Sequence, residues 1–95
     1  MKKNLEKIKK EITPILKSSD VKESFIFGSY ARGENSENSD IDMLIDFKGS
    51  KTLLDLVSLK LNLEKKIGKK VDLVTSGAVS PLLRNIIEKE RVKIL

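Results

Sequence analysis

A short stretch of the chain carries two groups of residues whose types suit phosphate and metal chemistry. Gly28 and Ser29 form a Gly-Ser pair, and ten residues later Asp40 and Asp42 form an Asp-x-Asp motif. Glycine lets a backbone approach a ligand closely, and free N–H groups at a strand-to-helix turn favour anions. Two carboxylates at this spacing can share magnesium ions, which prefer oxygen ligands and accompany phosphates. The spacing therefore indicates a site for a nucleoside triphosphate and its divalent cations.

Three residues near these motifs carry weaker signals. Arg32 could pair with phosphate oxygens or anchor the loop by binding an acid such as Glu34, and the sequence does not choose between these roles. Tyr30, the only tyrosine, is predicted to be a packing residue. Asp46 is predicted to be a solvated strand end, too far along to join the acidic pair.

The composition limits the available chemistry. The chain has 95 residues, 39% of them hydrophobic, and contains neither cysteine nor histidine. Disulfides, thiolate zinc sites, Ser-His-Asp triads and imidazole-bound metals are therefore excluded. We expect one domain over residues 1–95. We also expect a cytoplasmic protein, because no apolar run approaches the roughly 20 residues that span a bilayer and the acid-containing start is not a signal peptide.

The net charge of +5 is unevenly distributed. Residues 1–22 hold seven lysines and three acids, whereas residues 34–46 hold five acids and no basic residue. A solvated helix face is favoured for the basic segment over a nucleic-acid surface, because no aromatic residues interleave with its lysines. The acidic segment is more informative, since neighbouring carboxylates repel one another and usually need a cation.

Alternating helices and strands are predicted to position these residues. Helical spacing marks residues 4–16, where Pro14 predicts a kink or an end near Thr13. A contiguous apolar run predicts a buried strand over residues 23–27 that leads into Gly28. The other predicted elements are a short helix from Ser29 to about Ala31, a polar loop over 33–38, a helix over 53–67 closed by Gly68, a strand over 70–75, a helix opened by Ser80 and Pro81, and a fourth strand over 92–95.

Residues 40–47 alternate in polarity with the period of a strand. One face would carry Ile41, Met43, Ile45 and Phe47, and the other would carry Asp40, Asp42, Leu44 and Asp46. The two aspartates of the motif would then lie on one face, with Cα atoms roughly 6.5–7 Å apart. The element pattern predicts an α/β protein but does not by itself fix the strand order.

Three motifs together resemble those of the DNA-polymerase-beta-like nucleotidyltransferases. They are Gly28-Ser29-x-Ala31-Arg32-Gly33, Ser39-Asp40-x-Asp42 and Val71-Asp72-Leu73-Val74. Within that superfamily the chain resembles the minimal nucleotidyltransferases (MNT), the antitoxin halves of HEPN/MNT toxin–antitoxin pairs. The resemblance extends from about Lys2 to Leu95. It implies a small mixed β-sheet of three or four strands with helices packed on it.

The resemblance also implies a set of site residues. Asp72 would be the third carboxylate of the family pattern, delivered from a neighbouring strand, although without the resemblance it is an ordinary polar position in a half-exposed strand. The catalytic and metal-binding residues would be Asp40, Asp42 and Asp72, holding two magnesium ions. The nucleotide-binding residues would be Gly28, Ser29 and Arg32.

The implied reaction transfers AMP from ATP to a hydroxyl group and releases pyrophosphate. By resemblance the acceptor is a tyrosine of a HEPN-domain ribonuclease toxin, which AMP would silence. Relatives that modify antibiotics, tRNA ends or poly(A) tails carry further domains for their acceptors. We therefore expect a macromolecular partner, docked around residues 82–87.

Two other functions remain open at this point. The chain could be a binding module, an antitoxin that blocks its partner by occupancy without chemistry. It could also bind nucleic acid through the basic first helix. The presence of all three carboxylates favours the enzyme, because a module without chemistry has no reason to keep them clustered.

Overall fold

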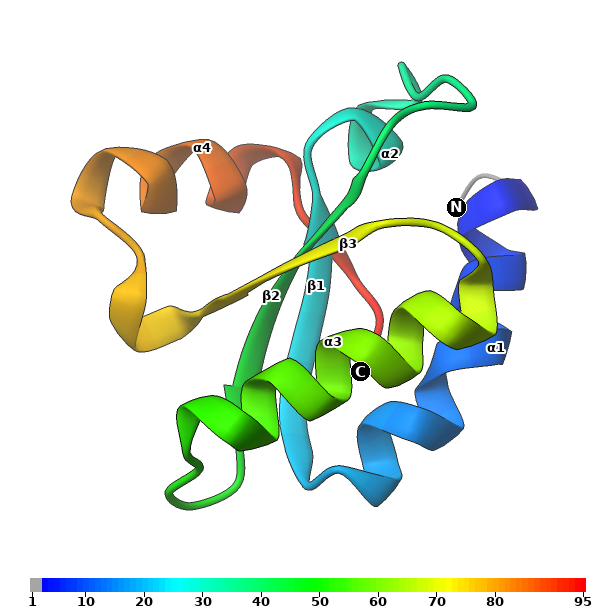
Figure 1. Cartoon of the computed structure of the whole chain (residues 1–95). Helices are drawn as coiled ribbons and strands as arrows, with labels where there is room; N and C mark the ends of the chain where they lie inside the picture. Colours follow the sequence, from blue (N-terminus) through cyan, green and yellow to red (C-terminus); the bar gives the residue numbers. More distant parts are fainter. Residues whose placement is uncertain (1–2) are drawn as a thin grey trace.

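The computed structural model describes residues 3–95, so Met1 and Lys2, which the sequence analysis includes in the basic segment, lie outside it. Four strands form one sheet in the order β3-β2-β1-β4 (Figure 1). Strand β1 (Val21–Phe27) pairs antiparallel with β2 (Ile41–Phe47) and with β4 (Val92–Lys93). Strand β2 pairs in parallel with β3 (Val71–Thr75). The small mixed sheet expected from the sequence is confirmed.

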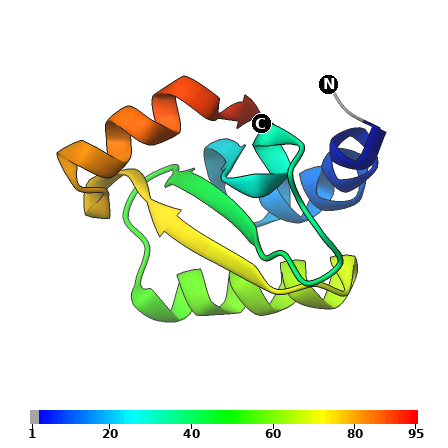
Figure 2. The same cartoon turned by 90° about the horizontal axis from the view of Figure 1, so that it is seen from above.

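The helices occupy both sides of this sheet. Helices α1 (Lys3–Ser18) and α3 (Leu53–Ile67) pack against each other on one side, and α3 connects the two parallel strands. Helix α2 (Ser29–Arg32) is a single turn that follows β1 directly. The 3₁₀ turn η1 (Ser76–Ala78) and helix α4 (Pro81–Glu90) lead from β3 to β4. Figure 2 shows α3 and α4 on opposite sides of the sheet.

The main core lies between the sheet and the α1–α3 pair. On β2 the side chains of Ile41, Met43 and Ile45 are all fully buried. Their cover comes from α1 and α3, whose buried side chains include Leu5, Ile8, Ile12, Leu16, Leu59 and Leu63. The predicted alternation of β2 is therefore confirmed, because its apolar face is the one that contacts this core.

The predicted helix ends are confirmed by their hydrogen bonds. Gly68 has a left-handed backbone with a φ of 75°, and its N–H donates to the Glu64 carbonyl, which closes α3. Ser80 caps α4, since its Oγ accepts from the Leu83 N–H at 3.3 Å, and Pro81 occupies the first helical position.

The first helix does not end near Thr13, which is one of the two outcomes that Pro14 predicts. Helix α1 continues through Pro14 to Ser18. A proline inside a helix costs about 3 kcal/mol, because it removes one hydrogen bond and crowds the preceding turn. Here the ring is exposed, and Ile12 and Leu16 on either side of it are fully buried. Burial of the two flanking side chains outweighs the local preference of the proline.

Three strands begin at different residues from those predicted, and one of them is β3, which starts at Val71 rather than at residue 70. Strand β1 starts at Val21 rather than at residue 23, and β2 starts at Ile41, so Asp40 lies just before the strand and not in it. The sheet still includes the predicted fourth strand, β4, which pairs with β1. Within residues 3–95, no helix has both the length and the apolar character that crossing a membrane requires.

Candidate active site

One end of the sheet brings most of the predicted site residues together. Phe27, the last residue of β1, pairs with Asp42 on β2, and Asp42 pairs in turn with Asp72 on β3. Residues paired in register on neighbouring strands share a face of the sheet. The resemblance implied that Asp72 comes from a neighbouring strand, and the topology places it beside Asp42, which is half-buried while Asp72 is exposed.

Gly28 joins this acidic pair to the turn that follows β1. Its backbone has a φ of 77° and a ψ of −153°, a conformation that side chains with a Cβ rarely adopt. A Cβ added to Gly28 would also collide with the Asp42 carboxylate. Glycine is therefore required here both by the backbone and by the close approach of Asp42.

The surroundings of Asp42 favour its protonated form. Burial is the main cause that raises the pKa of Asp42, and the negative charges of Asp72, Asp40 and Glu90 raise it further, while Arg32 opposes them. A carboxylate whose pKa is raised by other carboxylates gains from a cation that neutralises them.

Asp40, whose negative charge helps to raise the pKa of Asp42, is half-buried and lies just before β2. Pairing with β3 begins immediately after it, where the Ile41 N–H donates to the Lys70 carbonyl at 2.9 Å. Across residues 3–95, no three acidic side chains are grouped closely enough to hold a metal ion. The structure thus brings Asp42 and Asp72 side by side in the sheet, with Asp40 next to the pair, and does not form a finished three-carboxylate cluster.

The donor set nevertheless fits a hard divalent cation. All the side chains that raise the pKa of Asp42 are carboxylates, and magnesium prefers oxygen ligands of this kind. The absence of a Cβ at Gly28 leaves the backbone in direct contact with the Asp42 carboxylate. A phosphate held at this turn would therefore lie next to the Asp42 carboxylate.

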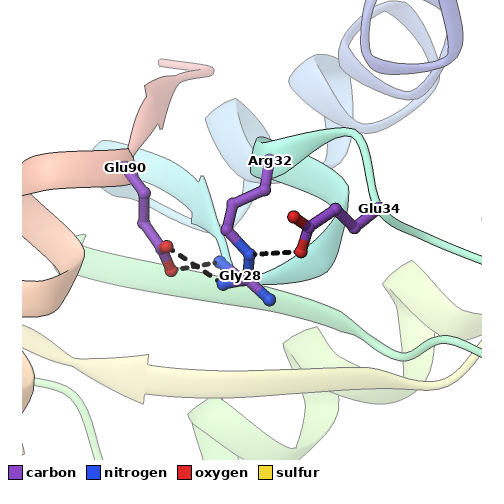
Figure 3. Close-up of polar contacts among 4 residues, drawn as sticks. All are labelled: Gly28, Arg32, Glu34 and Glu90. Atoms are coloured by element: carbon purple, nitrogen blue, oxygen red, sulfur yellow. Dashed lines mark hydrogen bonds and ion pairs between the residues drawn. The ribbon is translucent and has the colours of Figure 1, made fainter.

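Arg32, whose role the sequence left open, contacts two carboxylates. Its Nε donates to Glu34 Oε2 at 2.9 Å, as one of the two predictions expects, and its Nη1 donates to Glu90 Oε2 at 3.0 Å (Figure 3). Glu90 Oε1 also accepts from the Gly28 N–H at 2.8 Å. Arg32 is thus an anchor of the turn in this structure.

Glu90 is the site residue that sequence reasoning missed. It lies 62 residues beyond Gly28, so no local spacing connects them. One signal could have found it: an acid at the end of α4 opposes the helix dipole, which favours basic residues there. An acidic residue at a helix end that disfavours negative charge indicates a compensating contact from elsewhere in the fold.

Tyr30 and Ser29 lie in the turn, and Asp46 lies toward the other end of β2. Tyr30 is 3% exposed and packs in the core, as predicted. Ser29 is half-buried, and its carbonyl accepts from the Glu34 N–H at 2.9 Å, which holds the end of α2. Asp46 is not the solvated strand end expected from the sequence, because it is half-buried and its Oδ1 accepts from Ser76 Oγ at 3.3 Å.

A hollow of about 540 Å³ lies beside α2, and its lining contains none of the predicted catalytic residues. Tyr30 and residues of α1, of the polar loop after α2 and of the end of α3 line it. Its lining mixes lysine and glutamate side chains and shows no grouped ligands. We therefore base the candidate site on the carboxylates and the glycine turn.

The chain matches the family model of the nucleotidyltransferase domain over residues 5–94. A relative from Methanocaldococcus jannaschii, MJ0435, provisionally assigned as a protein adenylyltransferase, is 50% identical over 97% of this chain and 99% of its own length. Protein adenylyltransferase MntA of Thermococcus cleftensis is 42% identical over 70% of this chain and 73% of its own.

Solved structures agree with these matches. A protein provisionally described as a minimal nucleotidyltransferase has a TM-score of 0.82 and 35% identity, over 94% of this chain and 91% of its own. A chain in the structure of a tri-AMPylated Shewanella oneidensis HEPN toxin in complex with MNT antitoxin has a TM-score of 0.75 and 18% identity. That match covers 95% of this chain and 71% of the other, and it shows a shared fold. The resemblance drawn from the motifs is confirmed.

Proposed function

Because this chain belongs to the nucleotidyltransferase domain family, we propose that it is a magnesium-dependent protein adenylyltransferase. It transfers AMP from ATP to a hydroxyl group of a HEPN-domain toxin and so acts as an antitoxin. The observation that carries this proposal is the contact of the Gly28 turn with Asp42, which is paired in register with Asp72. Two relatives are named protein adenylyltransferases, one of them provisionally, and this supports the AMP donor chemistry.

One group of site residues binds the triphosphate, and another group binds the metal ions. Gly28 lets the backbone approach the triphosphate, and the Ser29 hydroxyl donates to a phosphate oxygen. Asp42 and Asp72, which pair in the sheet, and the neighbouring Asp40 would hold two magnesium ions that arrive with the triphosphate. Bound magnesium neutralises charge on the triphosphate and makes the acceptor hydroxyl more acidic.

The transfer is a displacement at the α-phosphorus of ATP. The acceptor oxygen forms a bond to this phosphorus, the bond to the bridging oxygen breaks, and pyrophosphate leaves. A carboxylate oxygen of Asp72 accepts the proton of the acceptor hydroxyl. Its exposed position supports this role, because an acceptor on another protein must reach it from solvent.

Arg32 acts as an anchor rather than as a direct phosphate ligand. Both of its side-chain hydrogen bonds go to carboxylates, those of Glu34 and Glu90. A phosphate oxygen would have to displace one of these partners. This arrangement supports the loop-holding role over the phosphate-binding role.

The acceptor is a tyrosine brought by the HEPN partner. The antitoxin complex of Shewanella oneidensis, in which the HEPN toxin is tri-AMPylated, supports a partner of this class. Apolar side chains on α4 offer a docking surface, since Leu82 is 74% exposed and Ile86 is 47% exposed. This surface lies within the segment 82–87 predicted from the sequence.

Calorimetry of ATP binding tests the site. We expect ATP to bind in the presence of magnesium and to bind more weakly with a chelator. Ser29→Ala should weaken binding about 10- to 150-fold, because it removes a hydrogen bond to a charged phosphate. Ser58→Ala is the matched control, since Ser58 is exposed on α3. Equal affinity with chelator, or equal affinity in Ser29→Ala, would contradict the proposed site.

A further inference from the structure

Glu90 bridges two parts of the turn that follows β1, Gly28 and Arg32. Its side chain is 16% exposed, and its two carboxylate oxygens have different partners. Oε1 accepts from the Gly28 N–H at 2.8 Å, and Oε2 accepts from Arg32 Nη1 at 3.0 Å (Figure 3). A single carboxylate on α4 therefore contacts both the residue that opens α2 and the residue that ends it.

Helix α2 needs such a contact to keep its place. It has four residues, and a helix of one turn has almost no stability of its own. Few backbone bonds close it: the Arg32 N–H donates to the Gly28 carbonyl at 3.1 Å, the Gly33 N–H to the Tyr30 carbonyl at 3.3 Å and the Glu34 N–H to the Ser29 carbonyl at 2.9 Å. Gly28 is buried, so its N–H needs an acceptor inside the protein. Glu90 supplies that acceptor and closes a ring of hydrogen bonds through Gly28 and Arg32.

The backbone around Glu90 is itself fixed against the sheet. The Arg91 N–H donates to the Ile87 carbonyl at 2.8 Å, which ends α4. Val92, two residues after Glu90, pairs with Ile26 on β1, the strand that ends just before Gly28. Glu90 therefore lies where α4 leads into β4, the strand that pairs with β1. A carboxylate at the end of α4 is unfavourable for the helix dipole.

We propose that Glu90 is a positioning residue for the nucleotide: it holds the Gly28–Ser29 turn and Arg32 in the arrangement that receives the triphosphate. This inference rests on the proposed function. Glu90 does not contact the nucleotide, because its two oxygens are already bound to the turn. It acts through Gly28, whose Cα lies against the Asp42 carboxylate.

Three variants of the full chain test this role by calorimetry with ATP and magnesium. Glu90→Ala removes both acceptors and should weaken binding about tenfold or more, as expected for loss of hydrogen bonds that involve charge. Glu90→Gln keeps an oxygen for the Gly28 N–H but loses the charge that pairs with Arg32, so it should recover part of the affinity. Glu88→Gln is the matched control, because Glu88 is exposed on the same helix.

The melting temperature of each variant separates positioning from stability. A role in folding alone would lower the melting temperature of Glu90→Ala and leave its ATP affinity unchanged well below that temperature, and this result would overturn the inference. Tighter ATP binding in Glu90→Ala would also overturn it, because Glu90 would then compete with the phosphates. Failure of the wild-type chain to bind ATP and magnesium would instead overturn the proposed function, and this inference with it.

Discussion

The two faces of strand β2 are built in different ways. On one face Ile41, Met43 and Ile45 are fully buried beneath α1 and α3. On the other, Asp42 and Asp46 are half-buried and have polar or charged neighbours from β3, η1 and α4. Because side chains alternate along a strand, adjacent residues serve stability and chemistry separately. Substitutions of neighbouring residues should therefore have separable effects.

The face of β2 that carries Asp42, here called the acidic face, lowers the stability of the fold, whereas the apolar face raises it. Burial and the charges of Asp72, Asp40 and Glu90 raise the pKa of Asp42, so its ionised form is disfavoured in the folded chain. A site that gathers like charges before its cation binds is expected to carry this penalty. Burial of apolar side chains on the core face offsets this penalty, and the following variants test both faces.

The largest effect is expected on the apolar face. Met43→Ala should lower the free energy of unfolding by about 2–5 kcal/mol, because it leaves a cavity in a fully buried position. Leu44→Ala, on the opposite face and half-buried, should cost clearly less. Chemical denaturation of both variants measures the difference. Equal losses would show that the two faces do not differ in packing.

Gly28 offers a smaller and more specific test of the contact between turn and strand. Gly28→Ala should lower stability by about 1–3 kcal/mol for the backbone alone, because a φ of 77° with a ψ of −153° is adopted essentially only by glycine, and further because its Cβ meets the Asp42 carboxylate. Gly49→Ala is a close control, since Gly49 has a φ of 74° but open space around it.

Denaturation of the two glycine variants gives the cost of the contact as the difference between them. We also expect Gly28→Ala, and not Gly49→Ala, to lose ATP binding. If the two variants lose equal stability and both bind ATP, the close approach of Asp42 to Gly28 affects neither stability nor ATP binding.

The smallest effect concerns the charge of Asp42. Its pKa is raised above the value of 3.8 expected in the unfolded chain, so the folded chain binds more protons as the pH falls toward that value. Stability therefore decreases as the pH rises through this window, and the penalty persists at neutral pH. Asp42→Asn should be more stable than wild type at pH 7, by less than about 1 kcal/mol because solvent screens this part-exposed group.

The pH dependence gives the measurement for this variant. Urea denaturation without magnesium should show the advantage of Asp42→Asn at pH 7 and its loss as the pH falls to about 3.8, because wild-type Asp42 in the folded chain becomes protonated above that pH. Asp46→Asn serves as the control on the same strand. A wild-type chain more stable than Asp42→Asn at pH 7 would mean that Asp42 has a compensating partner in the folded state.

Local patterns in the sequence predicted the apolar face and the helix ends. The alternation of residues 40–47, Gly68 at the end of α3 and the Ser80-Pro81 start of α4 each depend on neighbours within a few residues. Pro14 does not end α1, because buried side chains on both sides of it hold the helix together. Tertiary packing of this kind is not visible in a local pattern.

The acidic face could be predicted only in part for the same reason. The motif residues Gly28, Asp42 and Asp72 were identified, but the pairing of Asp42 with Asp72 depends on strand order, which periodicity does not fix. Glu90 reaches Gly28 across 62 residues and has no motif of its own. Contacts between distant segments complete this site, whereas contacts between near neighbours complete the core.

The mass of the partner after incubation with ATP tests the central claim most directly. Wild type, Asp42→Asn and Asp46→Asn are each incubated as the full chain with magnesium, ATP and the proposed HEPN-domain partner. We predict that wild type and Asp46→Asn add one or more AMP units to the partner and that Asp42→Asn adds none. If Asp42→Asn neutralises the partner as well as wild type, with no mass added by either, the chain is a binding antitoxin and the enzymatic account is wrong.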